Sequence, residues 1–124
     1  MDFTLTDEHR ALQQMARDFA EKEIRPISAE RDLIPDPRET FDWEIIKKGS
    51  ALGLRTIAVP ERLGGPGVDR LGQVLVILEL ARADGAIAKS FSQNWKFTPF
   101  LTEPANVEQR ERFLPAFLEN DTFM

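Results

Sequence analysis

The residues that most resemble a ligand-binding motif are three glycines in a short turn. Residues 60–67 read PERLGGPG and lie between the apolar runs 56–59 and 74–78. An apolar run, a glycine-rich turn and another apolar run is the order of a phosphate-binding βα unit. A dinucleotide fingerprint needs G-x-G-x-x-G, however, and a P-loop needs Gly-Lys-Ser/Thr. Pro66 also removes one amide hydrogen that phosphate would use. We therefore predict that this stretch is a sharp chain reversal and not a phosphate site.

The remaining candidates for catalysis are few. The chain has no cysteine and a single histidine, His9, so thiolate nucleophiles, serine triads and most transition-metal sites are disfavoured. We expect His9 to be a solvent-facing or helix-terminal residue. Glu79 interrupts an otherwise apolar segment, and it is either paired with Arg82 or polar for another reason. We favour the pair, because an unpaired buried carboxylate is costly.

Composition narrows the class of protein further. The 124 residues are enough for one globular domain, and the net charge of −5 disfavours a nucleic-acid partner. The longest apolar stretch, residues 74–78 followed by 80–81, is too short to cross a membrane. The first residues lack the pattern of a signal or transit peptide, so we expect a cytoplasmic protein.

Helical periodicity and helix-end signals dominate the first half of the chain. Thr6 is a predicted N-cap for a helix that reaches about Ile24, after which Pro26 should break or kink it and residues 27–31 should form a short second piece. A further helix is predicted from about residue 40 to 52, capped by Gly53. Residues 56–59 are short and β-branched, and we predict that they are extended.

The second half gives three more helices. Asp69 should cap a helix over residues 70–83, which is apolar nearly all round and should be buried on most faces; its length favours a helix over a strand. Residues 86–101 should form a helix bent at Pro99. Asn106 should cap the last helix, which runs to residue 118 with Phe113 and Phe117 facing inward. The predicted fold is all-α, an up-and-down bundle of five to six helices with one short extended segment.

Several short motifs, in order, resemble the N-terminal part of acyl-CoA dehydrogenases. The motifs occur in the same order as in that family and extend over nearly the whole chain. They are FTLTDE at 3–8, FAEKEIRP at 19–26, LGL at 52–54 with VPERLGG at 59–65, ELARAD at 79–84, and EQRERFLP at 108–115. Each motif alone is weak, and together they are specific.

The resemblance implies the N-terminal helical domain of a flavoenzyme. Such an enzyme adds a middle β-domain and a C-terminal four-helix bundle, is usually a homotetramer, and holds FAD between those two further domains. A carboxylate removes the α-proton of an acyl-CoA thioester while the flavin takes the β-hydride. Residues 1–118 match the helical domain, and residues 119–124 match the start of the connection to the middle domain. We expect the chain to be this domain alone, as a fragment or a truncated product, and by itself neither to bind FAD tightly nor to turn over acyl-CoA.

The resemblance also implies a role for the helix after residue 85, as one wall of the acyl pocket. The corresponding lining positions are Lys89, Ser92, Gln93 and Lys96. Residues 90–97 (SFSQNWKF) are more polar and bulkier than a pocket for a plain fatty chain requires. If the lysines face the pocket, a polar, aromatic or acidic acyl group is expected. The alternative is that both lysines face solvent or a further domain.

Other functions remain open on the sequence. Acyl-CoA oxidases, nitroalkane oxidases and flavin-dependent monooxygenases share the fold, and their distinguishing residues would lie beyond residue 124. A free-standing helical module that docks on a partner is a non-enzymatic alternative. The apolar surface that neighbouring domains would cover should be exposed, so we also expect self-association or marginal stability.

Overall fold

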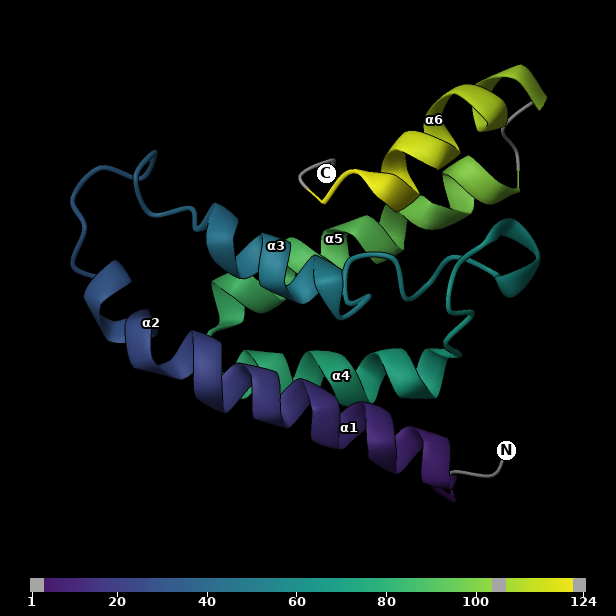
Figure 1. The fold of residues 1–124 in the computed structure, drawn as a ribbon. Helices are drawn as coiled ribbons and strands as arrows, with labels where there is room; N and C mark the ends of the chain where they lie inside the picture. The colour runs from purple at the N-terminus through teal and green to yellow at the C-terminus, as the bar shows by residue number, and fades with distance from the viewer. Residues whose placement is uncertain (1–3, 104–106, 122–124) are drawn as a thin grey trace. The chain divides into compact units, whose positions relative to one another are not determined.

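The computed structural model describes residues 4–103 and 107–121. The chain divides into two compact units, each built from two stretches of sequence (Figure 1). The first unit comprises Met1–Asp42 and Asp69–Lys89, and the second comprises Trp43–Val68 and Ser90–Met124.

The described residues are mostly helical and contain no strand, so the predicted all-α class is confirmed. The α-helices are α1 (Asp7–Phe19), α2 (Arg25–Arg31), α3 (Trp43–Ala51), α4 (Arg70–Ala83), α5 (Gly85–Thr102) and α6 (Val107–Glu119). A π-helical segment, Ala20–Ile24, connects α1 to α2, and a 3₁₀ turn covers Glu61–Leu63. If α1, the π segment and α2 are counted as one continuous helix, the described residues contain five helices, and if α1 and α2 are counted separately, they contain six. Both counts agree with the five to six helices predicted from the sequence.

The N-terminal helix begins and continues for local reasons. The Thr6 side chain accepts a hydrogen bond from the His9 amide, and the His9 ring accepts one from the Thr6 amide, which completes a capping box. Pro26 does not end the helix as one prediction allowed. The chain passes through the π-helical segment and restarts as α2 with Pro26 in its first turn, where a missing amide hydrogen costs nothing.

In the first unit, α1 packs against α4 (Figure 1). The two helices run in the same direction, because His9 meets Asp69 at their starts and Ser28 meets Asp84 beyond the end of α1. Asp69 caps α4 as predicted, with its Oδ1 accepting a hydrogen bond from the Gly72 amide at 2.7 Å. Helices far apart in sequence are therefore direct neighbours.

The prediction that α4 is buried on most faces is confirmed, and a single face of the helix is exposed. Val74 and Leu78 are 50% and 55% exposed, whereas Val76 and Leu80 are fully buried. The apolar residues of α4 surround the helix, so their periodicity did not indicate which side faces the core.

In the second unit, α3 ends in a Schellman motif. The Gly53 amide donates to Ser50 O at 2.9 Å and the Leu54 amide donates to Gly49 O at 3.0 Å. Gly53 has a φ of 79°, a conformation that glycine adopts without strain, so its predicted role as a C-terminal cap is confirmed.

The extended conformation predicted for residues 56–59 is wrong. Residues 52–58 form turns, in which the Thr56 amide donates to Gly53 O and the Val59 amide donates to Thr56 O. Leu54, Ile57 and Val59 are buried, so residues of this turn segment contribute side chains to the core. Burial, which is tertiary, outweighs the extended preference of single residues here.

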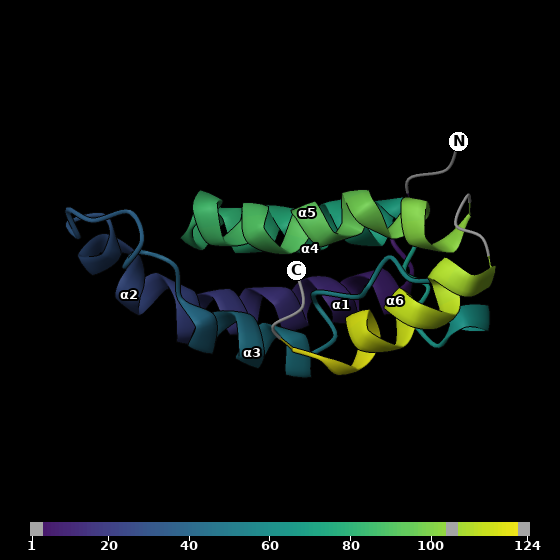
Figure 2. The same ribbon diagram turned by 90° about the horizontal axis from the view of Figure 1, so that it is seen from above.

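The C-terminal helices close the second unit. Val59, Leu114 and Phe117 form a core cluster, with Leu63, Leu101 and Leu118 packed against it, so α6 lies beside the end of α5 and the turn around Glu61–Leu63 (Figure 2). The prediction that Phe117 faces inward is confirmed.

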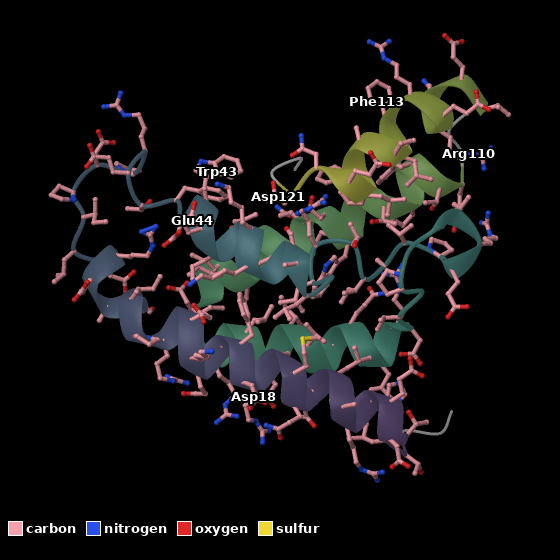
Figure 3. All side chains as sticks on the ribbon, in the orientation of Figure 1. Asp18, Trp43, Glu44, Arg110, Phe113 and Asp121 are labelled. Atoms are coloured by element: carbon pink, nitrogen blue, oxygen red, sulfur yellow. The ribbon has the colours of Figure 1, made fainter. Side chains whose placement is uncertain are left out.

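Two further predictions concern α6. Phe113 is 38% exposed and lies with its ring under Arg112, so its predicted inward orientation is wrong. Arg110 and Phe113 project from α6 in Figure 3. The predicted Asn106 cap lies outside the described residues.

Candidate functional site

The four residues predicted to line an acyl pocket lie on α5, from its second turn to just past its middle. Lys89 and Lys96 are seven residues apart, about two helical turns, so both lie on the same face of the helix with Gln93 between them. Both lysines are exposed, and Ser92 and Gln93 are half-buried. The helix thus brings the four predicted residues together along one side.

The opposite side of α5 is fixed by the core of the second unit. Phe91 and Thr98 are fully buried, and the indole N–H of Trp95 donates to Leu54 O at 2.7 Å. A Cβ at Gly49 would overlap the Phe91 ring, so α3 approaches α5 closely at this point. These contacts set the rotation of α5 and therefore direct the predicted face away from the core.

Two aromatic residues on the same side were not predicted from the sequence. Phe97 and Phe100 are 62% and 66% exposed, and their ring centroids are 6.3 Å apart with the planes tilted by 44°. Exposed phenylalanines in mutual contact are unusual on a protein surface. Lys96 lies one turn before Phe100, so this face combines cationic, amide and aromatic groups. The nearest signal in the sequence was the bulk of residues 90–97.

The glycine turn does not bind phosphate through its glycine amides. The Gly64 amide donates to Glu61 O, the Gly65 amide to Pro60 O and the Gly67 amide to Val59 O. All three N–H groups that a phosphate would use are therefore occupied. Gly64 and Gly67 have φ values of 89° and 66°, which explains why glycine stands at these positions. The turn is the chain reversal that the sequence predicted, and its residues do not fit a flavin phosphate.

His9 joins the starts of α1 and α4. Its Nε2 lies 3.0 Å and 3.1 Å from the two carboxylate oxygens of Asp69, and its Nδ1 accepts from the Thr6 amide, so the proton is on Nε2. The pKa of Asp69 is lowered, chiefly by the Gly72 amide and then by His9. His9 is helix-terminal as predicted, but its side chain is only 12% exposed, so it is not solvent-facing. This geometry gives it a structural role.

Glu79 is the most strongly perturbed carboxylate. It is 5% exposed and accepts from Arg82 at 3.0 Å, which confirms the predicted pair. Two further donors come from α1: Gln13 Nε2 lies at 2.9 Å, and Arg17 donates at 2.8 Å and 3.1 Å. Arg17, followed by Gln13, lowers the pKa of Glu79 to about 2 against the opposing effect of burial. Because both carboxylate oxygens accept hydrogen bonds from these side chains, Glu79 ties α1 to α4 and is not placed as a catalytic base.

Two further kinds of feature were sought in the described part of the chain. Within residues 4–103 and 107–121, no group of three or more histidine, cysteine or acidic residues is placed to hold a metal ion. Over the same described residues, no helix is both long and apolar enough to cross a membrane.

Comparison with known proteins places the chain in a family. The model described as "Acyl-CoA dehydrogenase, N-terminal domain" matches residues 6–121. The chain therefore belongs to the acyl-CoA dehydrogenase family, in its N-terminal domain.

Individual relatives agree with this assignment. The chain is 35% identical over 118 residues to the 3-(aryl)acrylate reductase of Clostridium sporogenes. The matched region covers 94% of this chain and 30% of that protein. Its fold is similar to a chain in the structure of the electron transferring flavoprotein of Acidaminococcus fermentans, with a TM-score of 0.81, 32% identity, and coverage of 98% and 31% of the two chains. It is also similar to butyryl-CoA dehydrogenase from Megasphaera elsdenii, with a TM-score of 0.69, 30% identity, and coverage of 96% and 31%. The chain thus spans about 30% of the length of these relatives.

Proposed function

We propose that this chain is the helical domain of an FAD-dependent enzyme that removes hydrogen from the α and β carbons of an acyl-CoA thioester. The observation that carries the proposal is the family match over residues 6–121, supported by the structural similarity to butyryl-CoA dehydrogenase. In this proposal residues 1–118 are the helical domain, and residues 119–124 begin the connection to a middle β-domain. Flavin, when bound, accepts the hydride from the β carbon.

The role of this chain is to supply one wall of the acyl pocket. Lys89, Ser92, Gln93 and Lys96 would contact the acyl group from α5, whose rotation is fixed by Phe91 and Trp95 on its other side. A wall that binds the acyl group and excludes water raises the basicity of a carboxylate across the cleft. The chain alone, in which the glycine turn does not hold phosphate, is proposed to be inactive and to bind no flavin tightly.

The remaining partners follow from the family. We propose that the complete enzyme has the middle and C-terminal domains of its relatives, assembles as a homotetramer, and works in the cytoplasm. Acyl-CoA is its substrate, and no nucleic acid or membrane partner is proposed.

Reduction of an α,β-unsaturated acyl group is a second candidate function. The 35% identical relative is named as a reductase of 3-(aryl)acrylate, and reduction is the same two-electron exchange in the opposite direction. The exposed Phe97 and Phe100 on the α5 face would suit an aryl substituent.

The α5 wall is tested in the protein that includes this chain and the rest of its reading frame. We expect Lys96→Met to change KM for the acyl-CoA substrate by at least about threefold with kcat nearly constant, because a wall residue contributes binding and not chemistry. Lys22→Met, an exposed lysine in the π-helical segment, is the matched control. Equal KM values for all three proteins would remove Lys96 from the pocket, and assays in both directions would separate dehydrogenase from reductase.

A further inference from the structure

Arg55 is a charged residue in the core of the second unit. It is 1% exposed, the lowest exposure of any charged side chain among the buried residues of the described chain. Its guanidinium carbon lies 4.8 Å from the centroid of the Phe117 ring of α6, and its Nε donates to Ser50 Oγ of α3 at 3.3 Å. A buried guanidinium is costly unless the surrounding structure compensates its charge.

The groups that compensate the charge of Arg55 include a residue of the segment after α6. Ser50 Oγ, which accepts from Arg55, itself donates to the main-chain oxygen of Asp121 at 3.1 Å. The Asp121 carboxylate raises the pKa of Arg55 and so opposes the lowering that burial causes. Ser50 and Arg55 are thus connected to a residue more than sixty positions later in the chain, two residues beyond the end of α6.

We propose that Arg55 and Ser50 form an internal anchor that holds the segment 119–121 against the end of α3, and so fixes the direction in which the chain leaves α6. Helix ends normally fray, because their last carbonyls lack partners. Here α6 is held at its last turn by the contact of Phe117 with Arg55 and beyond it by Asp121. Arg55 is a positioning residue in this role. The anchor does not depend on the proposed enzymatic activity.

The test is amide hydrogen exchange measured by NMR on the 124-residue chain. The reporter is the Asn120 amide, which donates to Ala116 O at 3.0 Å and is released when the end of α6 opens. For Ser50→Ala, which removes the hydroxyl that joins Arg55 to the Asp121 main-chain oxygen, we expect Asn120 to exchange about tenfold faster, a change of about 1.4 kcal/mol in the local opening free energy. Asp121→Asn keeps that hydrogen bond and removes only the carboxylate charge, so we expect a smaller increase. Amides in the middle of α6 should keep their wild-type rates. Alanine favours helix more than serine does, so Ser50→Ala should not lower global stability.

Two further variants make the outcome decisive. Glu119→Gln changes an exposed acidic residue at the same helix end and should leave Asn120 exchange unchanged. In an Arg55→Met background, Asp121→Asn should have no additional effect, because the charge it serves is gone. Wild-type exchange in both Ser50→Ala and Asp121→Asn would overturn the anchor. An effect of Glu119→Gln equal to that of Asp121→Asn would also overturn it. If Arg55→Met does not fold, the single variants of Ser50 and Asp121 decide the question.

Discussion

At the scale of single residues, Glu79 combines one partner from its own helix with two partners from a helix distant in sequence. Its partner Arg82 is three residues away on the same helix, so the sequence indicated this pair. Its partners Gln13 and Arg17 come from α1, more than sixty residues earlier, and no local spacing could reveal them. The carboxylate is stable where it is buried because three donors replace the water that it lost.

The ionised Glu79 should stabilise the fold above its ordinary pKa. Its folded pKa of about 2 is below the ordinary 4.5, so its contribution is complete above pH 4.5 and is lost as the pH falls from about 4.5 to about 2. That contribution is at most about 3 kcal/mol, less the part that solvent removes because Arg17 and Arg82 are 43% and 60% exposed on their side chains. Urea unfolding of the wild type and Glu79→Gln should therefore give a difference that is large at pH 6 and shrinks towards pH 2.

Asp18→Asn is the matched control for this measurement. Asp18 points away from α4 in Figure 3 and accepts a hydrogen bond from Gln14 at 2.7 Å on the surface of α1. Its substitution should change the free energy of unfolding by less than about 0.5 kcal/mol at every pH. A wild-type to Glu79→Gln difference that stays constant between pH 6 and pH 2 would show that the charge of Glu79 is not what ties α1 to α4.

At the scale of elements, the contact between α3 and α5 depends on a missing side chain. Gly49 lies in the last turn of α3, where alanine would ordinarily favour the helix. A Cβ at this position would overlap the ring of Phe91, which is fully buried. The close approach therefore outweighs helix propensity.

Two glycine substitutions separate these effects. We expect Gly49→Ala to lower the free energy of unfolding by about 1–3 kcal/mol, the usual range for overpacking a core. Gly85→Ala, at the first position of α5, meets no atom within 4 Å and should be neutral or slightly stabilising. Thermal unfolding of both variants checks this, and a Gly49→Ala protein as stable as Gly85→Ala would contradict the packing described for Phe91.

Helix positions were largely predictable from the sequence because their signals are local. Thr6, Gly53 and Asp69 are caps whose side chain or backbone conformation acts within a few residues, and each was found where predicted. Three features depend on longer-range packing and were not found. These are the π-helical segment before Pro26, the turns over residues 52–58, and the exposed side of α4. For the candidate site, the family resemblance indicated Lys89 and Lys96 but left their orientation open. The core contacts of Phe91 and Trp95 show that this face of α5 points away from the core of the second unit.

At the scale of the whole molecule, the chain exposes apolar surface on separate helices. Phe97 and Phe100 are exposed on α5, and Val74 and Leu78 are exposed on α4. The chain also spans only about 30% of the length of its relatives. Both observations agree with the proposal that further domains complete the enzyme and supply the flavin site. The sequence could indicate the family through its ordered motifs, whereas the location of the flavin site remains part of the proposal.

Our main proposal is that this chain is the helical domain of a flavoenzyme acting on acyl-CoA. Its most direct test is an anaerobic titration of the protein expressed from the longest reading frame that contains these residues. We predict a yellow protein with one flavin per subunit, whose absorbance is bleached by a saturated acyl-CoA, and a colourless preparation of the 124-residue chain alone. A complete protein that carries no flavin, or a flavin that neither acyl-CoA nor its α,β-unsaturated counterpart affects, would contradict the proposed function.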